Sequence, residues 1–455
     1  MALNKKVILL ILFDLSAAIL AIPIAFLFRF REIPTVGKLM ELGLSRIFIF
    51  AFVLVFVSYL VETYKSHRNF KNRELVVRII VSLVLSFFIL SSLYYSVPFF
   101  MFGKGVIVIA LFVFGTLQIL CFAGYQWCKR FRGFAKRILI LGTGPLACRM
   151  GDIIPVTDGN YILSGYVNCS NETVHVPDGT ILETREKLYE TVRREKADQI
   201  VVSITERRGV LPLQEIMTCK LSGIEVVDAP SFYEQMTGKL LLENINPSWF
   251  IFSDGFRITA LTRIIKRVLD VVCSTVGITV ILPFLPFIVL AIKLDSPGPV
   301  LFRQERVGER ERSFVLYKFR TMSEDAERSS GAVWAQKEDP RVTRVGNFYR
   351  KSRIDEIPQL FNVLKGEMSL VGPRPERPEF VEKLKTVIPY YSERHFVKPG
   401  VTGWAQVRYP YGASVEDALE KLRYDLYYIK NLSLTFDIMI VLETVKVVLF
   451  RRGGR

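Results

Sequence analysis

Apolar residues gather in five long runs along the chain. The first four runs cover residues 7–28, 44–61, 75–97 and 105–128, and the fifth covers residues 268–292. Most of them reach the roughly 20 residues that a helix needs to cross the hydrocarbon core of a bilayer. The pattern therefore predicts four transmembrane helices within residues 1–130 and a further apolar segment in the second half of the chain.

Basic residues flank the first four runs unevenly. Lysines and arginines gather between the second and third runs and after the fourth, whereas the loop between the third and fourth has only Lys104. The positive-inside rule then places both ends of this bundle in the cytoplasm, although basic residues in the first loop favour the opposite. Asp14 and Arg78 fall inside predicted spans near their cytoplasmic ends. We expect both to snorkel to the membrane surface, although a charge within a span is by default a functional candidate.

The fifth run is interrupted by Pro283 and Pro286, which remove helical hydrogen bonds. Both of its flanks are basic, with Arg263, Lys266 and Arg267 before it and Lys293, Arg303 and Arg306 after it. A helix that crosses would leave one basic flank outside. We therefore expect a re-entrant helix that enters the membrane, breaks at the prolines and returns, with an ordinary kinked span as the alternative.

Residues 131–240 change to short strands that alternate with helical stretches. Strands are predicted at 137–141, 161–167, 199–204 and 224–228. The first is followed by Gly142, Gly144 and Ala147 in the spacing G-x-G-x-x-A, a fingerprint typical of dinucleotide-binding folds. The alternation predicts a parallel, Rossmann-like α/β sheet.

Three features count against a working NAD site in this domain. Pro145 lies in the glycine turn, and Asn168 stands near the place of the expected ribose-binding acid. No tyrosine of the domain is followed four residues later by lysine, the pair that short-chain dehydrogenases use. We interpret the domain as a degenerate one that regulates or assembles. Residues 241–260, rich in aromatic and turn residues, are predicted to be a linker near the membrane interface.

The composition agrees with a membrane protein. The chain has 455 residues, half of them hydrophobic, and a formal net charge of +16. Nucleic-acid binding could account for that charge, but no DNA- or RNA-binding motif accompanies it, so anionic lipid is the better partner. The six cysteines form no CxxC pair and are expected to be reduced, as in the cytoplasm.

Two adjacent carboxylates, Asp355 and Glu356, stand out in residues 350–375. A short apolar-periodic segment follows them and ends at Gly366, so both acids are predicted to lie near a helix N-terminus, which favours phosphates. Arg350 and Arg374 flank the pair. Carboxylates, arginines and a helix N-terminus together predict phosphate chemistry with a divalent metal.

Further cations and glycine turns surround this stretch in the sequence. Arg320 belongs to a predicted strand at 317–322, and Arg341 to a turn at 339–346. Lys398 and Gln406 delimit a glycine-punctuated loop whose backbone can approach a ligand. These residues complete the candidate phosphate- and substrate-binding set of Arg320, Arg341, Arg350, Arg374, Lys398 and Gln406.

Residues from about 262 to 452 resemble the bacterial sugar transferase family, the monotopic polyprenol phosphate glycosyl-1-phosphate transferases. The matching motifs are Lys318-Phe-Arg-Thr-Met, Asp339-Pro-Arg, Arg350 with Asp355-Glu-Ile-Pro-Gln-Leu-Phe-Asn-Val-Leu-Lys-Gly, Ser369-Leu-Val-Gly-Pro-Arg-Pro and Pro399-Gly-Val-Thr-Gly-Trp-Ala-Gln. With its spans and Rossmann-like insert, the whole chain resembles the large WbaP-like members. The Ser253-Asp-Gly-Phe and Arg408-Tyr-Pro-Tyr-Gly stretches are similar to the EpsB-like, exosortase/PEP-CTERM-associated exopolysaccharide branch.

This resemblance implies an undecaprenyl-phosphate sugar-1-phosphate transferase of exopolysaccharide biosynthesis. Asp355 would be the nucleophile that takes a phosphosugar from a UDP-sugar, releases UMP and passes the phosphosugar to undecaprenyl phosphate. Glu356 would act with it around Mg²⁺ (or Mn²⁺). UDP-glucose or UDP-galactose is the expected donor. Lys398 stands where many members have arginine, and Arg408-Tyr-Pro-Tyr replaces their Asn-Gly-Arg-Asn run, so phosphate and sugar contacts there are open.

The expected fold is therefore that of a multi-domain α/β membrane protein. Its parts are four transmembrane helices (1–130), the degenerate Rossmann-like domain (131–240), a linker (241–260) and a catalytic domain with the re-entrant helix 268–292 (261–455). The expected location is the bacterial inner membrane with the catalytic domain on the cytoplasmic face, and a second copy of the chain is a candidate partner in a homo-oligomer. The alternatives are a membrane-bound NAD-dependent nucleotide-sugar dehydratase or epimerase and a non-catalytic polysaccharide-assembly scaffold.

Overall fold

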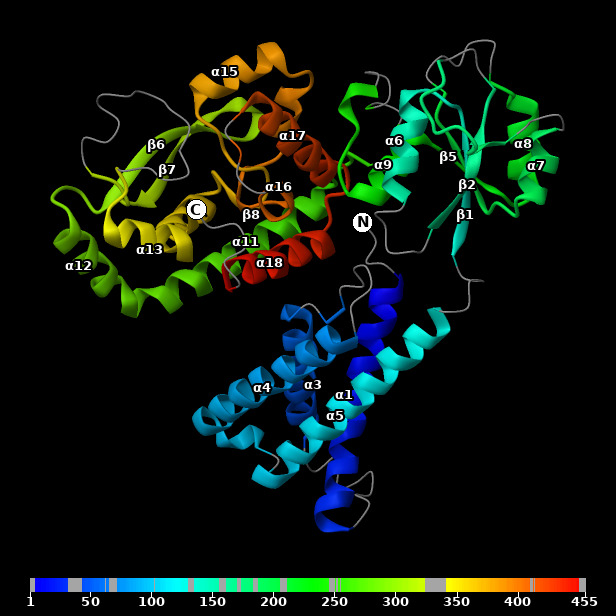
Figure 1. The fold of residues 1–455 in the computed structure, drawn as a ribbon. Coiled ribbons are helices and arrows are strands. Elements are labelled where there is room, and N and C mark those ends of the chain that lie inside the picture. Colours follow the sequence, from blue (N-terminus) through cyan, green and yellow to red (C-terminus); the bar gives the residue numbers. More distant parts are fainter. Residues whose placement is uncertain are drawn as a thin grey trace. The chain divides into compact units, whose positions relative to one another are not determined.

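The structure is a computed structural model of the chain, and it forms two compact units, Met1–Phe232 and Tyr233–Arg455 (Figure 1). It describes residues 5–31, 43–61, 63–64, 72–101, 103–129, 135–154, 161–169, 173–182, 187–204, 211–244, 250, 253, 255–323, 341–409, 412 and 414–449. The predicted basic loops between the first three apolar runs, and the Asp339-Pro turn, lie outside these residues. The units divide after residue 232, whereas the sequence predicts a domain boundary after residue 240.

The predicted helical bundle is present. Its helices are α1 (Lys5–Phe30), α3 (Leu44–Leu60), α4 (Asn72–Ser96) and α5 (Lys104–Lys129), with a 3₁₀ turn, η1 (Pro98–Phe100), between the last two. Helices α1 and α4 each contact both α3 and α5. Ala18, Ala21 and Ala25 of α1 are fully buried, since small side chains let membrane helices approach closely.

Four helices of the described chain are long and apolar enough to cross a membrane, and they make the chain a membrane protein. They are Ile8–Phe30, Val76–Ser96, Gly105–Gly124 and Ala260–Asp295. Helix α3 is equally apolar but has only 17 residues. The predicted helices at all five apolar runs are thus confirmed, and α3 is the shortest of them.

Asp14 lies inside the bundle, so the prediction that it snorkels to the surface is wrong. Its side chain is 1% exposed and accepts hydrogen bonds from the Tyr64 hydroxyl at 2.7 Å and the Gln118 amide at 2.5 Å. The same amide lies 3.2 Å from the Ser58 hydroxyl. These partners satisfy the carboxylate within the protein, which removes the need to reach water.

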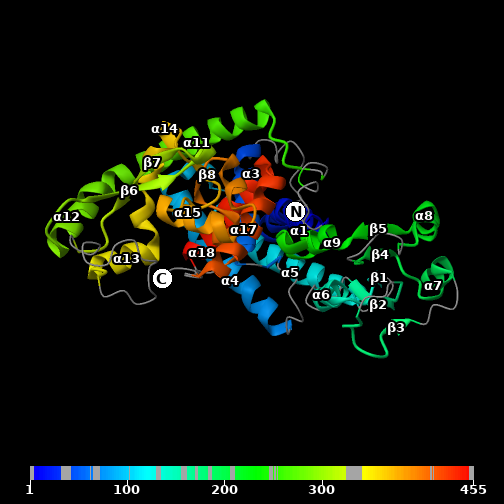
Figure 2. The same cartoon turned by 90° about the horizontal axis from the view of Figure 1, so that it is seen from above.

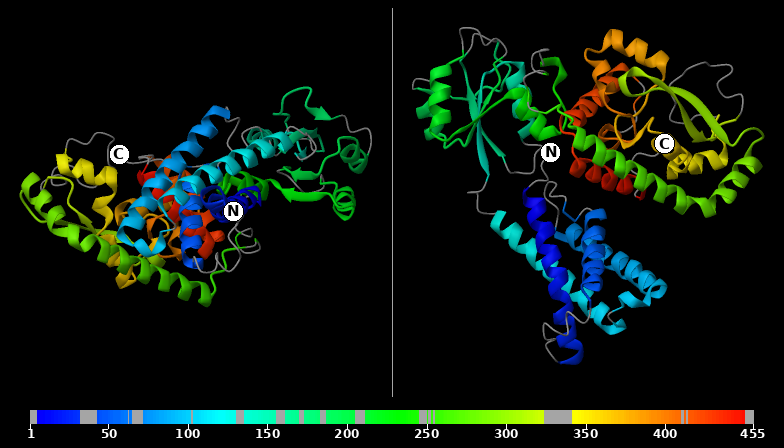
Figure 3. Two further views of the ribbon diagram at one scale, coloured as in Figure 1. Left: turned by 90° about the horizontal axis from the view of Figure 1, so that it is seen from below. Right: turned by 180° about the vertical axis from the view of Figure 1, so that it is seen from behind.

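The second part of the first unit is a parallel sheet, as predicted, and it has five strands where the sequence predicts four. Its strands are β1 (Lys136–Leu141), β2 (Tyr161–Val167), β3 (Ile181–Leu182), β4 (Gln199–Val202) and β5 (Glu225–Asp228), in the order β3-β2-β1-β4-β5. Helix α6 (Pro145–Ile153) lies on one face of the sheet, and α7 (Leu188–Arg194) and α8 (Leu213–Leu221) lie on the other (Figures 1 and 3). Helix α9 (Ala229–Thr237) follows β5.

The glycine fingerprint of this sheet is closely covered by its own chain. A β-carbon at Gly142, whose φ is +123°, would lie 2.9 Å from the Ser203 hydroxyl oxygen. The Thr143 carbonyl accepts a hydrogen bond from the His175 N–H at 2.8 Å. The close approach of Ser203 explains why position 142 is glycine. The interpretation of the domain as degenerate stays a prediction.

The second unit begins with a bent apolar helix pair. Helix α11 (Ala260–Ile281) leads through the 3₁₀ turn η5 (Leu282–Phe284) into α12 (Leu285–Asp295), which turns away from the axis of α11 (Figures 1 and 3). The break falls at the two prolines, as predicted. Only 11% of the most apolar stretch is buried, and Phe287 is 72% exposed. An apolar surface that is this exposed indicates a segment that lies in lipid.

One face of α11 is nevertheless tied to the rest of the unit by polar contacts. Arg267 donates to the carbonyls of Val363 and Leu364 at 2.6 and 2.7 Å. Asp270 is 4% exposed and accepts hydrogen bonds from the Leu370 N–H and the Ser369 hydroxyl. The helix pair therefore presents apolar side chains outward while its polar face is satisfied by protein.

The remaining elements of the second unit combine short strands and helices (Figure 2). They are β6 (Leu301–Val307), η6 (Glu309–Glu311), β7 (Ser313–Phe319), α13 (Arg344–Ser352), η7 (Ile354–Glu356), α14 (Gln359–Lys365), β8 (Ser369–Val371), α15 (Pro378–Val387), η8 (Tyr391–Phe396), β9 (Gly400–Thr402), α16 (Trp404–Arg408), α17 (Val415–Lys430) and α18 (Leu434–Leu449), preceded by η4 (Leu242–Asn244). Strands β6 and β7 form an antiparallel hairpin, and β8 pairs with β9 in parallel.

The core of this unit is aromatic and extends to the segment before α11. Trp404 is 1% exposed, packs against Phe436 and donates its indole N–H to the Gly238 carbonyl at 2.8 Å. Phe250 and Phe256 pack against the same core. The described aromatic residues of the predicted linker therefore contact protein, and the position of that linker near the membrane interface stays a prediction.

Candidate active site

The two predicted acids lie in a tight 3₁₀ turn between α13 and α14. Arg353 ends α13 in the left-handed conformation, with φ of 59°, and so redirects the chain into η7. Asp355 and Glu356 are 7% and 6% exposed, and α14 begins three residues after Glu356. Gly366 ends α14 with φ of 88°. The prediction that both acids lie near the N-terminus of a helix closed by Gly366 is confirmed.

Glu356 is surrounded by three cations. Its Oε1 accepts hydrogen bonds from Arg374 at 2.8 Å and Arg353 at 3.2 Å, and the Lys318 ammonium lies 3.7 Å away. Burial alone would raise the pKa of this carboxyl group. The charges of Arg374, Lys318 and Arg353 outweigh burial and hold its pKa well below the usual range. Glu356 is therefore ionised at any physiological pH.

Asp355 has the opposite electrostatic character. Burial, and then the neighbouring Glu356 charge, raise the pKa of its carboxyl group, while Lys318, Arg353 and Arg374 limit the rise. Its Oδ1 is buried and has no hydrogen-bond partner. One acid is thus held as a partnered anion, and the other keeps an unpartnered oxygen with raised basicity. Such a pair separates an electrostatic role from a nucleophilic one.

Lys318 is a site residue that the candidate set omits. Burial, followed by the nearby charge of Arg374, lowers the pKa of its ammonium group to about 8. Lys318 belongs to β7, and Arg320 directly follows the last residue of that strand. The sequence predicts the strand, but it does not reveal that Lys318 lies near Glu356.

Arg374 is positioned by a buried network that sequence reasoning missed. Its backbone carbonyl accepts a hydrogen bond from Arg394 at 2.9 Å. Arg394 is 6% exposed and also contacts Asp425 at 2.8 Å and the Tyr391 hydroxyl at 2.7 Å. Arg394 and Asp425 come from η8 and α17, far apart in the sequence. Their pairing holds the turn that carries Arg374.

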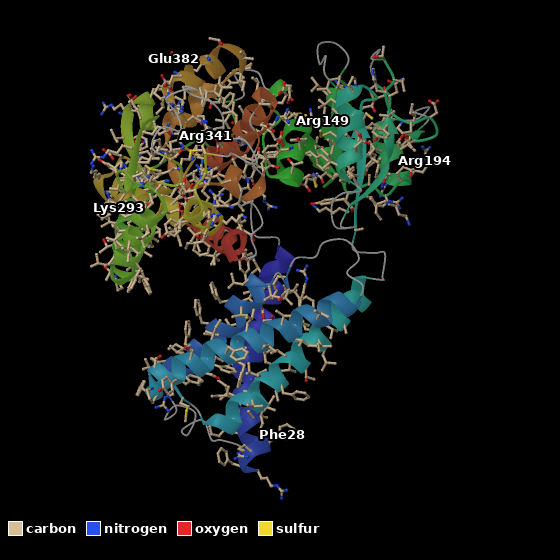
Figure 4. All side chains as sticks on the ribbon, turned by 60° about the vertical axis from the view of Figure 1, so that its left-hand side comes forward. Phe28, Arg149, Arg194, Lys293, Arg341 and Glu382 are labelled. Atoms are coloured by element: carbon tan, nitrogen blue, oxygen red, sulfur yellow. The ribbon has the colours of Figure 1, made fainter. Side chains whose placement is uncertain are left out.

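Arg320 directly follows β7, and Arg350 lies in the last turn of α13. Arg350 donates from Nε to the Thr321 hydroxyl at 2.9 Å. Arg320 is 7% exposed and donates from Nη2 to the Ser296 carbonyl at 2.6 Å. The Nε and Nη1 atoms of Arg320 have no hydrogen-bond partner. Arg341, labelled in Figure 4, precedes the isolated bridge between Met322 and Val342.

The glycine-punctuated stretch is more regular than predicted, because it forms β9 and α16. Gln406 donates to the Val401 carbonyl at 3.2 Å and keeps a buried Oε1 without a partner. The Lys398 ammonium lies beside Gly366, at the C-terminal end of α14. Asp355 precedes the other end of that helix, so the structure does not bring Lys398 together with the acids.

The carboxylates fit a magnesium ion only together with substrate oxygens. Among the described residues, no group of three or more His, Cys, Asp or Glu side chains is placed to hold a metal. Magnesium is often bound by one or two carboxylates plus substrate phosphates, which suits the unpartnered Oδ1 of Asp355. Glu356 fits less well, since its charge is already met by cations.

Taken together, these features define a membrane protein with a buried, cation-ringed acidic pair beside an exposed apolar helix. The sequence profile described as bacterial sugar transferase matches residues 261–451, which contain all of these site residues. The chain is also 42% identical to the exopolysaccharide production protein PSS of Rhizobium leguminosarum bv. phaseoli, of which it covers 98%. The chain belongs to the bacterial sugar transferase family.

Two larger relatives extend this similarity. The chain is 43% identical over 237 residues to the UDP-N-acetylgalactosamine-undecaprenyl-phosphate N-acetylgalactosaminephosphotransferase of Aeromonas hydrophila, covering 52% of this chain and 55% of that protein. It is 34% identical over 330 residues to the undecaprenyl-phosphate glucose phosphotransferase of Komagataeibacter xylinus, covering 71% and 61%. The chain thus spans a little over half the length of these two relatives.

Proposed function

We propose that this protein transfers hexose-1-phosphate from a UDP-sugar to undecaprenyl phosphate and releases UMP. The observation that carries the proposal is the pairing of Glu356, held as an anion by three cations, with Asp355, whose pKa is raised and whose Oδ1 is unpartnered. The names of the relatives support the choice of a nucleotide sugar and a polyprenyl phosphate as substrates.

The first half of the reaction forms a covalent intermediate on Asp355. Its carboxylate attacks the phosphorus that carries the sugar. A new bond joins that phosphorus to the carboxylate oxygen, the bond to the bridging oxygen of the diphosphate breaks, and UMP leaves with the electron pair. Because the pKa of Asp355 is raised, its carboxylate is more basic and thus a stronger nucleophile than an exposed one.

In the second half, an oxygen of undecaprenyl phosphate attacks the same phosphorus. The bond to Asp355 breaks, the carboxylate is restored, and undecaprenyl-diphosphate-sugar is the product. Arg374, Arg353 and Lys318 already surround the acids within 4 Å of Glu356. Fixed cations there offset the repulsion between a carboxylate, a diphosphate and a second phosphate.

Asp355, together with substrate phosphates, would hold magnesium, which would neutralise charge on the diphosphate. The main contribution of Glu356 would be to keep the three cations in place. The remaining candidates, Arg341 and Gln406, stay predicted substrate contacts, and Lys398 would bind substrate only at a distance from the acids.

The proposed setting is the cytoplasmic face of the bacterial inner membrane. The α11–α12 pair would enter the bilayer, bend at η5 and return. The basic residues at its first end bind the folded unit, and at its second end the chain continues into the same unit. Lys293, near the end of α12 and labelled in Figure 4, donates to the Gly298 carbonyl. The place in the EpsB-like exopolysaccharide branch, the domain boundaries and any oligomer remain predictions.

An assay of UMP release tests the proposal. Membranes with the full chain, Mg²⁺ and undecaprenyl phosphate are supplied in turn with UDP-glucose, UDP-galactose, UDP-N-acetylglucosamine and UDP-N-acetylgalactosamine. We expect UMP and a lipid-linked sugar from one of them, and at least a thousandfold lower turnover from Asp355→Asn. The exposed Lys351→Met, on the neighbouring helix, is the control and should keep wild-type turnover.

Two results would contradict the proposal. Full activity of Asp355→Asn would refute the nucleophile assignment. Absence of UMP release from all four donors, with a folded protein and lipid acceptor present, would favour a non-catalytic assembly role.

A further inference from the structure

Arg320 is a buried cation with unused hydrogen-bonding capacity. It is 7% exposed, yet two of its three guanidinium nitrogens, Nε and Nη1, have no partner. Buried polar groups are almost always paired, because an unpaired one loses its hydration without compensation. A guanidinium left in this state fits a site that receives an anion.

The position of Arg320 associates it with the membrane segment. Its third nitrogen, Nη2, donates to the carbonyl of Ser296, the C-cap residue of α12. Its backbone N–H continues the hairpin ladder by donating to the Val300 carbonyl at 2.9 Å. On α12, Phe287 and Leu294 are 72% and 79% exposed. Arg320 thus lies where an exposed apolar helix ends and the polar unit begins, the level at which a lipid phosphate meets water.

Arg320 is connected to the acidic pair through its neighbours in the chain and in the fold. Lys318 is the last residue but one of β7, and Arg320 follows the last residue of that strand, so their Cα atoms are roughly 6.6 Å apart. Lys318 faces Glu356 at 3.7 Å. Arg350, five residues before Asp355, donates a hydrogen bond to the hydroxyl of Thr321, the residue that follows Arg320. A phosphate at Arg320 could therefore reach a phosphosugar on Asp355, with its hydrocarbon chain along α12.

We propose that Arg320, supported by Arg350 and Thr321, binds the phosphate of the polyprenyl acceptor. Lys318, Arg353 and Arg374 then serve the diphosphate of the nucleotide sugar. This division rests on the proposed function. In the second half-reaction, Arg320 holds the acceptor phosphate while one of its oxygens attacks the phosphosugar and the bond to Asp355 breaks.

Steady-state kinetics of Arg320→Met tests the division. Loss of charge-assisted hydrogen bonds to a phosphate predicts a KM for undecaprenyl phosphate that rises about tenfold or more, while the KM for the UDP-sugar stays within about twofold. The matched control is Arg303→Met. Arg303 is exposed and opposes Tyr317, so it lies on the other face of the same hairpin, and neither KM should change.

A second readout isolates the first half-reaction. Exchange of labelled UMP into UDP-sugar without lipid requires only the donor site and Asp355. Arg320→Met should keep wild-type exchange, whereas Arg374→Met should lose it. Arg320→Lys keeps the charge and should give an acceptor KM between those of Arg320→Met and the wild-type protein. This variant replaces Arg320→Met in the test if the methionine variant does not fold.

An equal rise in both KM values, a rise for the donor alone, or an unchanged acceptor KM would overturn the assignment. Failure of the proposed function is a different result, because the wild-type protein would then release no UMP at all.

Discussion

We predict that Lys318 makes the proposed transferase activity sensitive to alkaline pH. Its ammonium group lies 3.7 Å from Glu356, but burial and the charge of Arg374 lower its pKa from the ordinary 10.5 to about 8. One pH unit above that value, only about a tenth of the molecules keep the charge. If the charged form is required, kcat/KM for UMP release falls about tenfold per pH unit above pH 8, since kcat/KM reports groups of the free enzyme.

Arginine at this position removes that sensitivity, because a guanidinium does not deprotonate in a protein. We expect the ratio of kcat/KM at pH 9 to that at pH 7 to be about one tenth in the wild-type protein and near one in Lys318→Arg. Lys318→Met should be slow at both pH values. The ratio corrects for any loss of activity that the larger side chain causes at pH 7.

The measurement is UMP release from membranes at low UDP-sugar concentration between pH 6.5 and 9.5. Lys351→Met, an exposed lysine variant of α13, is the control and should keep the wild-type profile. An unchanged alkaline midpoint in Lys318→Arg would show that another group controls the limb, and the role given to Lys318 would be wrong.

Two predictions concern stability. Burial raises the pKa of the Asp425 carboxyl to about 6, and Arg394 opposes the rise. A raised pKa favours the folded state most at low pH, so this contribution is lost as pH rises from about 4 through 6. Asp425→Asn should flatten the dependence of Tm on pH in that window; an unchanged slope would contradict the reasoning. In the bundle, Asp14→Ala leaves Tyr64 and Gln118 without their acceptor and should cost about 1–3 kcal/mol of unfolding free energy in detergent. Asp14→Asn should lose less, and equal losses would show that the hydrogen bonds are unimportant.

Much of the site could be predicted from local patterns in the sequence. Asp355 and Glu356 precede a short apolar-periodic segment, and Gly366 ends the helix in the left-handed region that favours glycine. The prolines of the fifth apolar run mark the bend at η5 for a similar reason, since proline lacks the N–H that a continuing helix uses. Both features depend on residues within one or two turns of each other.

The charge state of the site depends on contacts that no local pattern contains. Lys318 reaches Glu356 from β7 and Arg374 reaches it from the turn after β8. Arg394 and Asp425 meet from separate helices behind that turn. Burial raises the pKa of both carboxyl groups, but the three cations outweigh burial only at Glu356. Adjacency in the sequence therefore could not separate the roles of the two acids.

By itself, the sequence determined the apolar helices, the parallel sheet, the break at the prolines and the acidic pair. Each of these follows from hydrophobic period, backbone preference or direct adjacency, which act over a few residues. Only the tertiary structure decided that Asp14 is buried among hydrogen-bond partners, that three cations meet at Glu356, and that Arg320 keeps unpaired donors at the end of α12. These outcomes depend on which segments pack together and on how much water they exclude, and both are properties of the folded chain.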